Sequence, residues 1–257
     1  MKKKSFVPLL AGIVLLILGL AAVFVTRGAA IAEEAAASSK MVFALSLILA
    51  LVGAVTAVCG LLPERRPANV RTLAMAALFA ALCYIGFTYF RIDIPVGTEK
   101  TAFHLGNVFC VLAALFLGGM WGGMAGAVGM TLADLTTAYV TSAPKTFLLK
   151  LCIGLIAGFV AHRIFHLSRD SQRKIPLPVA TVLSCTAGMA FNIVADPLVG
   201  YFYKMYVMGI PQEFAKVWAK MGAVTTSVNA VVAVVCASVF YLALRPALRK
   251  SNLMPQI

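Results

Sequence analysis

Apolar runs long enough to cross a lipid bilayer dominate this chain. A spanning helix needs about 20 predominantly apolar residues, and candidate spans occur at about 6–26, 41–62, 72–90, 105–118, 120–140, 146–163, 177–203 and 221–244. Only 12% of the residues are charged, whereas a soluble domain carries roughly 25%. The sequence therefore predicts an all-α, polytopic helical membrane protein with eight spans.

Basic residues set the expected orientation. They cluster at 2–4, 65–71, 163–174 and 245–250, whereas the other connections carry mixed charge. Cationic loops stay on the cytoplasmic side, so both termini are expected to face the cytoplasm. The stretch 105–140 must then cross twice, with its break at the glycines of 118–123. The net charge of +13 follows from these clusters, so we expect no nucleic-acid binding.

Small residues recur at intervals of four around that break. Gly118, Gly122 and Gly126 form one series, and Gly119, Gly123 and Ala127 form a second. Such series let helix backbones approach closely in lipid. We therefore expect tight helix packing on both sides of this segment.

Polar side chains inside the spans gather at one depth. A rise of about 1.5 Å per helical residue places them towards the outer ends of five spans: His104, Asn107, Asp134, Lys150, Asn192, Asp196 and Asn229. Central charges in a membrane cost about 2.5–3.5 kcal/mol on insertion scales and usually mark function. The shared depth predicts an outward-facing polar binding pocket. The structural alternative is that Asp134 pairs with Lys150 while the asparagines link helices.

Motifs for catalysis are missing from the sequence. There is no GxSxG, HExxH, Walker A or dinucleotide-binding pattern. His162 and His166 are four residues apart but lack a carboxylate partner, so we expect them to mark a helix end. The six cysteines lie in apolar segments without CxxC spacing. We expect no enzyme activity, no cofactor and no metal site.

Two segments that follow one another along the chain carry a family resemblance. They are FHLGNVFCVLAALFLGGMWGGMAGAVGMTLADL, which starts at Phe103, and APKTFLLKLCIGLIAGFVA at 143–161. With them, the chain from about 68 to 247 resembles the substrate-binding S component of energy-coupling factor (ECF) vitamin transporters, and within that group the hydroxymethylpyrimidine and pyridoxine-type members. The resemblance implies a six-span bundle at 67–250, to which residues 1–66 add an N-terminal helical pair of unknown role and 251–257 a cytoplasmic tail.

The resemblance also implies partners and further sites. An S component binds its vitamin from outside and docks on an ECF transmembrane coupling subunit that two cytoplasmic ATPase subunits drive. The docking residues carried over to this chain are Ala76, Ala77, Ala80 and Ala81 on the first helix of the bundle. The outer loop at 91–103, with Arg91 and Asp93, corresponds to the family's gate. The expected location is the bacterial cell membrane.

Two other hypotheses remain open at this stage. One is a stand-alone proton-coupled permease that uses Asp134 or Asp196 as a proton site. The other is an intramembrane enzyme or a structural scaffold. The leading hypothesis remains a binding subunit that captures a small heterocycle, such as pyridoxine or hydroxymethylpyrimidine, for ATP-driven import.

Overall fold

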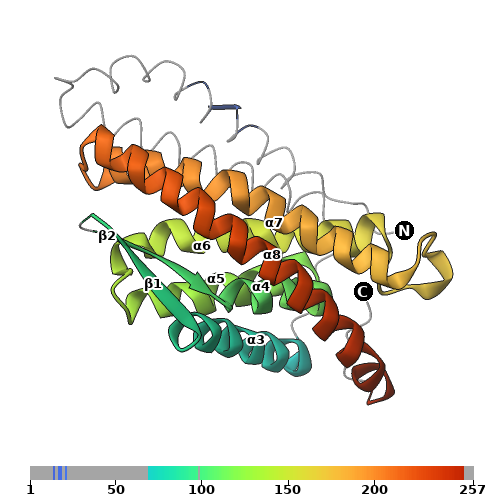
Figure 1. Cartoon of the computed structure of the whole chain (residues 1–257). Coiled ribbons are helices and arrows are strands. Elements are labelled where there is room, and N and C mark those ends of the chain that lie inside the picture. The colour runs from blue at the N-terminus through green and yellow to red at the C-terminus, as the bar shows by residue number, and fades with distance from the viewer. Residues whose placement is uncertain (1–13, 15–16, 19–20, 22–68, 98, 252–257) are drawn as a thin grey trace. The chain divides into compact units, whose positions relative to one another are not determined.

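Helices and one β hairpin make up the described part of the chain (Figure 1). The computed structural model describes residues 69–97 and 99–251, together with residues 14, 17, 18 and 21. The helical pair expected at 1–66 lies almost wholly outside the described residues, as does the tail from residue 252. The division of the chain at residues 66 and 250 therefore stays a prediction.

Among the described residues, six α-helices carry the fold. Their bounds are α3 Val70–Thr88, α4 Gly106–Leu117, α5 Gly119–Leu135, α6 Ala143–Phe159, α7 Leu177–Phe202 and α8 Gln212–Lys250. Short turns of other helix types follow or separate them: η1 Val140–Ser142, η2 Val160–Ile164, η3 Asp170–Gln172 and η4 Tyr203–Val207. The six helices lie at the six stretches that were expected to be spans after residue 67.

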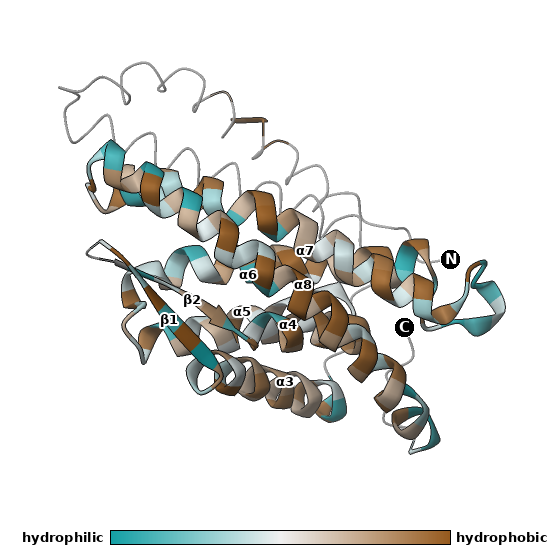
Figure 2. Cartoon of the chain, in the orientation of Figure 1, coloured by the Kyte–Doolittle hydropathy of each residue, from teal (hydrophilic) through white to brown (hydrophobic). Residues whose placement is uncertain are grey.

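Four described stretches are long and apolar enough to cross a membrane. They are Val70–Thr88, Val140–Ile164, Leu177–Val207 and Gln212–Lys250. Figure 2 shows hydrophobic residues along the helices and hydrophilic ones gathering at their ends and connections. The prediction of a helical, multi-pass membrane protein is confirmed. The count of eight spans and the cytoplasmic position of both termini stay predictions.

The break expected in 105–140 falls at Gly118. This residue has φ 82° and ψ 172° and separates α4 from α5, a left-handed backbone conformation that glycine adopts at little cost. Helix α4 has 12 residues, a rise of about 18 Å, and is buried along nearly its whole length. Helix α5 ends at Leu135 rather than near 140. Just after this end, the Thr136 and Thr137 hydroxyls donate to the Leu132 and Ala133 carbonyls.

The small-residue series produce the expected close packing. Gly122 and Gly126 of α5 lie against the Ala114 backbone and the Cys110 side chain of α4. In the second series, which includes Gly119 and Ala127, Gly123 lies against the backbone of α6 at Leu151. A methyl group at any of these glycines would overlap or crowd the neighbouring helix. The glycines therefore fix how α4, α5 and α6 pack.

A β hairpin forms the outer loop that was expected after α3. Strands β1 (Arg91–Val96) and β2 (Glu99–His104) pair antiparallel, from Arg91 opposite His104 to Val96 opposite Glu99. The tight turn uses Gly97 at φ 62°. Figure 1 shows the hairpin beside the ends of α3 and of the α5–α6 pair. The alternation of polar and apolar residues in RIDIPV is the local signal for this strand.

The chain divides into two compact units. Residues 198–219 belong to one unit, and residues 69–197 and 220–251 belong to the other. Within 198–219, the Lys204 Nζ atom lies 4.5 Å from the ring centroid of Trp218. The rings of Phe202 and Tyr206 stack with centroids 6.1 Å apart. Every predicted site residue lies in the larger unit.

Candidate functional site

An ion pair between α6 and α7 organises the buried polar groups. The Lys145 Nζ atom lies 2.8 Å from Asp196 Oδ1, and the Thr226 hydroxyl of α8 donates to Asp196 Oδ2 at 2.9 Å. Asp196 therefore links three helices. We call the set that surrounds this link the buried polar cluster; it comprises Asp134, Lys145, Thr146, Lys150, Asn192, Asp196 and Thr226.

Asp134 and Lys150 belong to this cluster but do not form an ion pair with each other. Their charges act on one another and on Asp196, and Thr146 of α6 is a polar neighbour of Asp134. The carboxylate that pairs is Asp196, and its partner is Lys145. The structural alternative of an Asp134–Lys150 pair is therefore wrong. Two carboxylates and two ammonium groups still balance the formal charge of the cluster.

Three buried carboxyl or carboxamide oxygens lack a hydrogen-bond partner among the described residues. They are Asn107 Oδ1, Asp134 Oδ2 and Asn192 Oδ1, in residues that are only 2%, 2% and 1% exposed. Asn192 lies one turn before Asp196 on α7. Asn107 lies one turn before Cys110, whose thiol donates to the Lys150 carbonyl at 3.7 Å. Buried acceptors without partners are uncommon and costly, so these oxygens are candidate contacts for a bound donor.

Asn229 of α8 uses its amide in a different way. Its Nδ2 donates to the Ala102 carbonyl at 2.9 Å, and its Oδ1 accepts from the His104 backbone N–H at 3.0 Å. One turn earlier, the Thr225 and Thr101 hydroxyls are 2.8 Å apart. The hairpin is thus bonded to α8 along β2.

The base of the hairpin is held by charge and aromatic contacts. Arg91 Nε lies 3.0 Å from Asp93 Oδ1, which also accepts a hydrogen bond of 2.9 Å from the Tyr139 hydroxyl. The Arg91 guanidinium lies 5.7 Å from the Phe87 ring centroid and 5.5 Å from that of Tyr139. The His104 ring meets Phe87 edge to face at 4.8 Å. Burial, with the nearby Lys150 and Arg91 charges, lowers the pKa of His104 to about 3, which keeps its ring neutral.

The four alanines expected to dock a partner point to two sides of α3. Ala76 is buried, and the Ala80 carbonyl lies against Gly129 of α5. Ala77 and Ala81 are exposed. The helical turn of about 100° per residue accounts for this division. Of the four, only Ala77 and Ala81 are exposed on the surface of the helix, and their docking on a partner stays a prediction.

Sequence reasoning missed Lys145 and Thr226. The span was expected to begin at 146, which left Lys145 in a loop, whereas α6 begins at Ala143 with Pro144 in its first turn. Proline at that position is a recognised signal of a helix start and would have placed Lys145 inside the helix. Thr226 lies three residues before Asn229 on α8, where its hydroxyl reaches the cluster.

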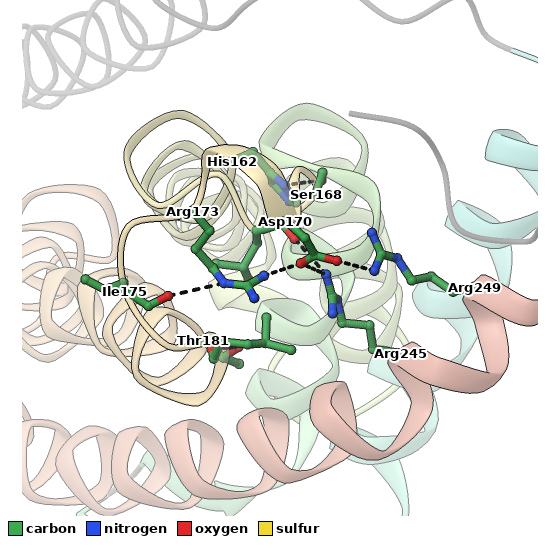
Figure 3. Close-up of polar contacts among 10 residues, drawn as sticks. His162, Ser168, Asp170, Arg173, Ile175, Thr181, Arg245 and Arg249 are labelled. Carbon is green, nitrogen blue, oxygen red and sulfur yellow. Dashed lines mark hydrogen bonds and ion pairs between the residues drawn. The ribbon is translucent and has the colours of Figure 1, made fainter.

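A second polar cluster lies at the other end of the bundle (Figure 3). The Asp170 carboxylate accepts hydrogen bonds from Arg173, Arg245 and Arg249. Arg245 also donates to the Leu167 carbonyl at 3.1 Å. Burial raises the pKa of Asp170, but the three arginines outweigh it and hold that pKa below its ordinary value. These contacts tie the end of α8 to the α6–α7 connection.

His162 and His166 lie at the end of the helix that begins with α6, as expected. Element η2 ends at Ile164, and His166 follows in a turn with φ 49°. The His162 Nδ1 atom lies 2.8 Å from the Ser168 hydroxyl, and its Nε2 lies 3.2 Å from the Ala114 carbonyl. Among the described residues, no group of histidine, cysteine and acidic side chains is arranged to hold a metal ion. His162 therefore joins α4 to the α6–α7 connection.

Comparison with known proteins identifies one family. The family model described as "ECF-type riboflavin transporter, S component" matches residues 68–246. No curated protein and no solved structure matches the chain. The matched range contains the buried polar cluster, the hairpin, helices α3 to α7 and all but the last four residues of α8. The resemblance to S components is confirmed, whereas the hydroxymethylpyrimidine and pyridoxine subgroup receives no support.

Proposed function

Because the chain belongs to the family of ECF-type riboflavin transporter S components, we propose that riboflavin is its ligand and that the buried polar cluster binds it. The family assignment makes the chain the substrate-binding subunit of an ECF-type vitamin importer and not an enzyme. S components associate with coupling and ATPase subunits, so the alternative of a self-sufficient proton-coupled permease is not retained.

The observation that carries the proposed site is the set of three unpaired acceptors. Asn107 Oδ1, Asp134 Oδ2 and Asn192 Oδ1 are buried without partners among the described residues. Riboflavin brings donors of two kinds, the hydroxyls of its ribityl chain and the imide N–H of its ring. A ligand that supplies donors to buried acceptors gains these bonds and removes the cost of leaving the acceptors unpaired.

Lys150 supplies the complementary group. Its residue is 7% exposed, and no ion pair to Lys150 occurs in the part of the chain that the structure describes. The ring carbonyls of riboflavin are acceptors that an ammonium group can bind. The ion pair of Lys145 with Asp196, by contrast, has both charges matched within the protein. We assign Lys150 to ligand contact and Lys145 to support of the site.

The partner surface is proposed on α3. Ala77 and Ala81 are exposed and lie four residues apart, a spacing that lets a second helix approach closely in a membrane. We assign them to contact with the ECF coupling subunit, Ala80 to packing against α5 and Ala76 to the core of the bundle. Two ATPase subunits and a location in the cell membrane belong to the same proposal.

Equilibrium binding to the purified full chain tests the ligand. Riboflavin, pyridoxine and hydroxymethylpyrimidine are titrated against wild type, Asp134→Asn, Asn192→Leu and a control, Ser227→Ala. Ser227 lies on α8, and among the described residues its hydroxyl bonds only to the Ala223 carbonyl of its own helix. We expect tight binding of riboflavin alone, weakened about tenfold or more by either site variant. Preference for pyridoxine or hydroxymethylpyrimidine refutes the ligand, and unchanged affinity in both site variants refutes the site.

A further inference from the structure

Strand β2 leaves one edge without a neighbouring strand among the described residues, because the sheet has two strands. Peptide groups two residues apart in a strand point to the same edge. On this edge, the Ala102 carbonyl and the His104 N–H both bond to the Asn229 carboxamide. A carboxamide carries the same donor and acceptor as a peptide group. Asn229 thus takes the place of one peptide unit of a third strand.

This contact matters because a two-stranded hairpin is marginally stable by itself. Asn229 is 6% exposed, and its two bonds connect segments more than a hundred residues apart in the chain, between α8 and β2. Thr225 adds its hydroxyl contact with Thr101, one turn away on the same side of α8. These bonds set the position of β2 on the bundle.

The bonded edge of the hairpin adjoins the buried polar cluster. Thr226, the neighbour of Thr225, binds Asp196. His104 is the last residue of β2, and the charges of Lys150 and Asp196 act on its ring. Displacement of β2 would therefore alter one side of the site, while residues on α5, α6 and α7 would keep their own contacts.

We propose that Asn229 is a positioning residue, a latch that holds the β1–β2 hairpin against α8 and so slows the release of bound ligand. Both its Oδ1 and its Nδ2 are bonded to hairpin backbone, so its effect on binding passes through β2. This inference rests on the proposed function for the ligand, but the attachment of the hairpin is measurable without any ligand.

Two readouts on the full chain in lipid nanodiscs test the latch. Hydrogen–deuterium exchange of peptides covering 99–105 reports the His104 N–H that donates to Asn229. Stopped-flow riboflavin fluorescence reports association and dissociation rates. One buried hydrogen bond shifts an equilibrium by roughly two- to tenfold. Asn229→Ala should therefore speed both exchange at 99–105 and riboflavin dissociation by about tenfold, with a smaller effect on association. Thr225→Val should give smaller changes of the same sign, and Ser227→Ala should change neither rate.

The outcomes separate the latch from direct ligand contact. Weaker riboflavin binding in Asn229→Ala with unchanged exchange at 99–105 overturns the proposal and makes Asn229 a ligand contact. If wild type binds no riboflavin, the proposed ligand fails while the exchange data still decide whether Asn229 holds the hairpin. If Asn229→Ala does not fold, Asn229→Leu replaces it. That variant keeps a side chain of similar size but can neither accept from the His104 N–H nor donate to the Ala102 carbonyl, so unchanged exchange in it also overturns the latch.

Discussion

Lys145 and Asp196 join α6 to α7 through an ion pair of 2.8 Å, in which the side chains are 7% and 20% exposed. The Thr226 hydroxyl binds the second carboxylate oxygen and extends the link to α8. The three helices that carry most of the buried polar cluster are therefore connected through one carboxylate. Its neighbours Lys150 and Asp134 are left free of this pair, and we assign both to the ligand.

Loss of one partner of this pair should destabilise the protein more than loss of both. Lys145→Met or Asp196→Leu leaves a largely buried charge without its counterion, at a cost of about 3 kcal/mol in the free energy of unfolding. The double variant removes both charges and should recover a large part of that loss. Chemical unfolding of the four proteins in detergent measures the coupling. Additive effects in the double variant would show that the pair contributes no interaction energy.

The coupling surface on α3 predicts a separation of binding from transport. Ala77→Trp and Ala81→Trp place a large ring on an exposed helix surface, so riboflavin affinity of the isolated chain should not change. Co-purification with the coupling and ATPase subunits, and ATP-driven uptake, should be lost. Val235→Trp on α8, at a residue that is 57% exposed, is the matched control and should retain both. Intact assembly in both alanine variants would place the coupling surface elsewhere.

His104 makes the stability of the protein depend on pH. Its pKa is lowered from the ordinary histidine value of 6.5 to about 3 in the folded chain, so between these values the unfolded chain binds more protons. Stability should therefore fall as the pH drops from about 6.5 towards 4, by at most about 1.4 kcal/mol per pH unit from this group. His104→Leu should flatten that slope in thermal unfolding measured across the range. An identical slope in the variant would mean that the pKa of His104 is not lowered in the folded chain.

The second polar cluster, Asp170 with its three arginines, predicts that loss of the acid and loss of an arginine have different effects on stability. Asp170→Asn removes the only acidic group among Arg173, Arg245 and Arg249 and should lower the melting temperature, since Arg245 is nearly buried. Adding Arg249→Gln should restore part of the loss, because one unmatched positive charge is removed. Glu213→Gln breaks an exposed ion pair with Lys216 and should have almost no effect. A melting temperature unchanged by Asp170→Asn would show that the arginines do not depend on the carboxylate.

Much of the helical architecture could be predicted from hydrophobicity and glycine spacing. The break at Gly118 and the packing of Gly122 and Gly126 followed from the need to cross the membrane twice and from the close approach that small residues permit. These features depend on residues that lie close together in the sequence. The hairpin was missed because the expectation of an outer loop took precedence over the alternation of Arg91, Ile92, Asp93 and Ile94.

The pairing of the polar residues could be predicted less well. Depth along a helix placed Asp134, Lys150 and Asp196 at a similar level, but it does not determine which side chains touch. That depends on the rotation of each helix about its axis. An error of three residues at the start of α6 removed Lys145 from consideration and left Lys150 as the apparent partner of Asp134. The bonds of Asn229 to hairpin backbone could not be predicted without the hairpin.

The most direct measurement for the central claim is mass spectrometry of small molecules released from the full chain, purified in detergent from cells grown with riboflavin, pyridoxine and hydroxymethylpyrimidine in the medium. Our account predicts that riboflavin co-purifies with wild type at close to one molecule per chain and is largely absent from Asn192→Leu. Release of a different vitamin, or equal riboflavin retention by Asn192→Leu, would contradict it.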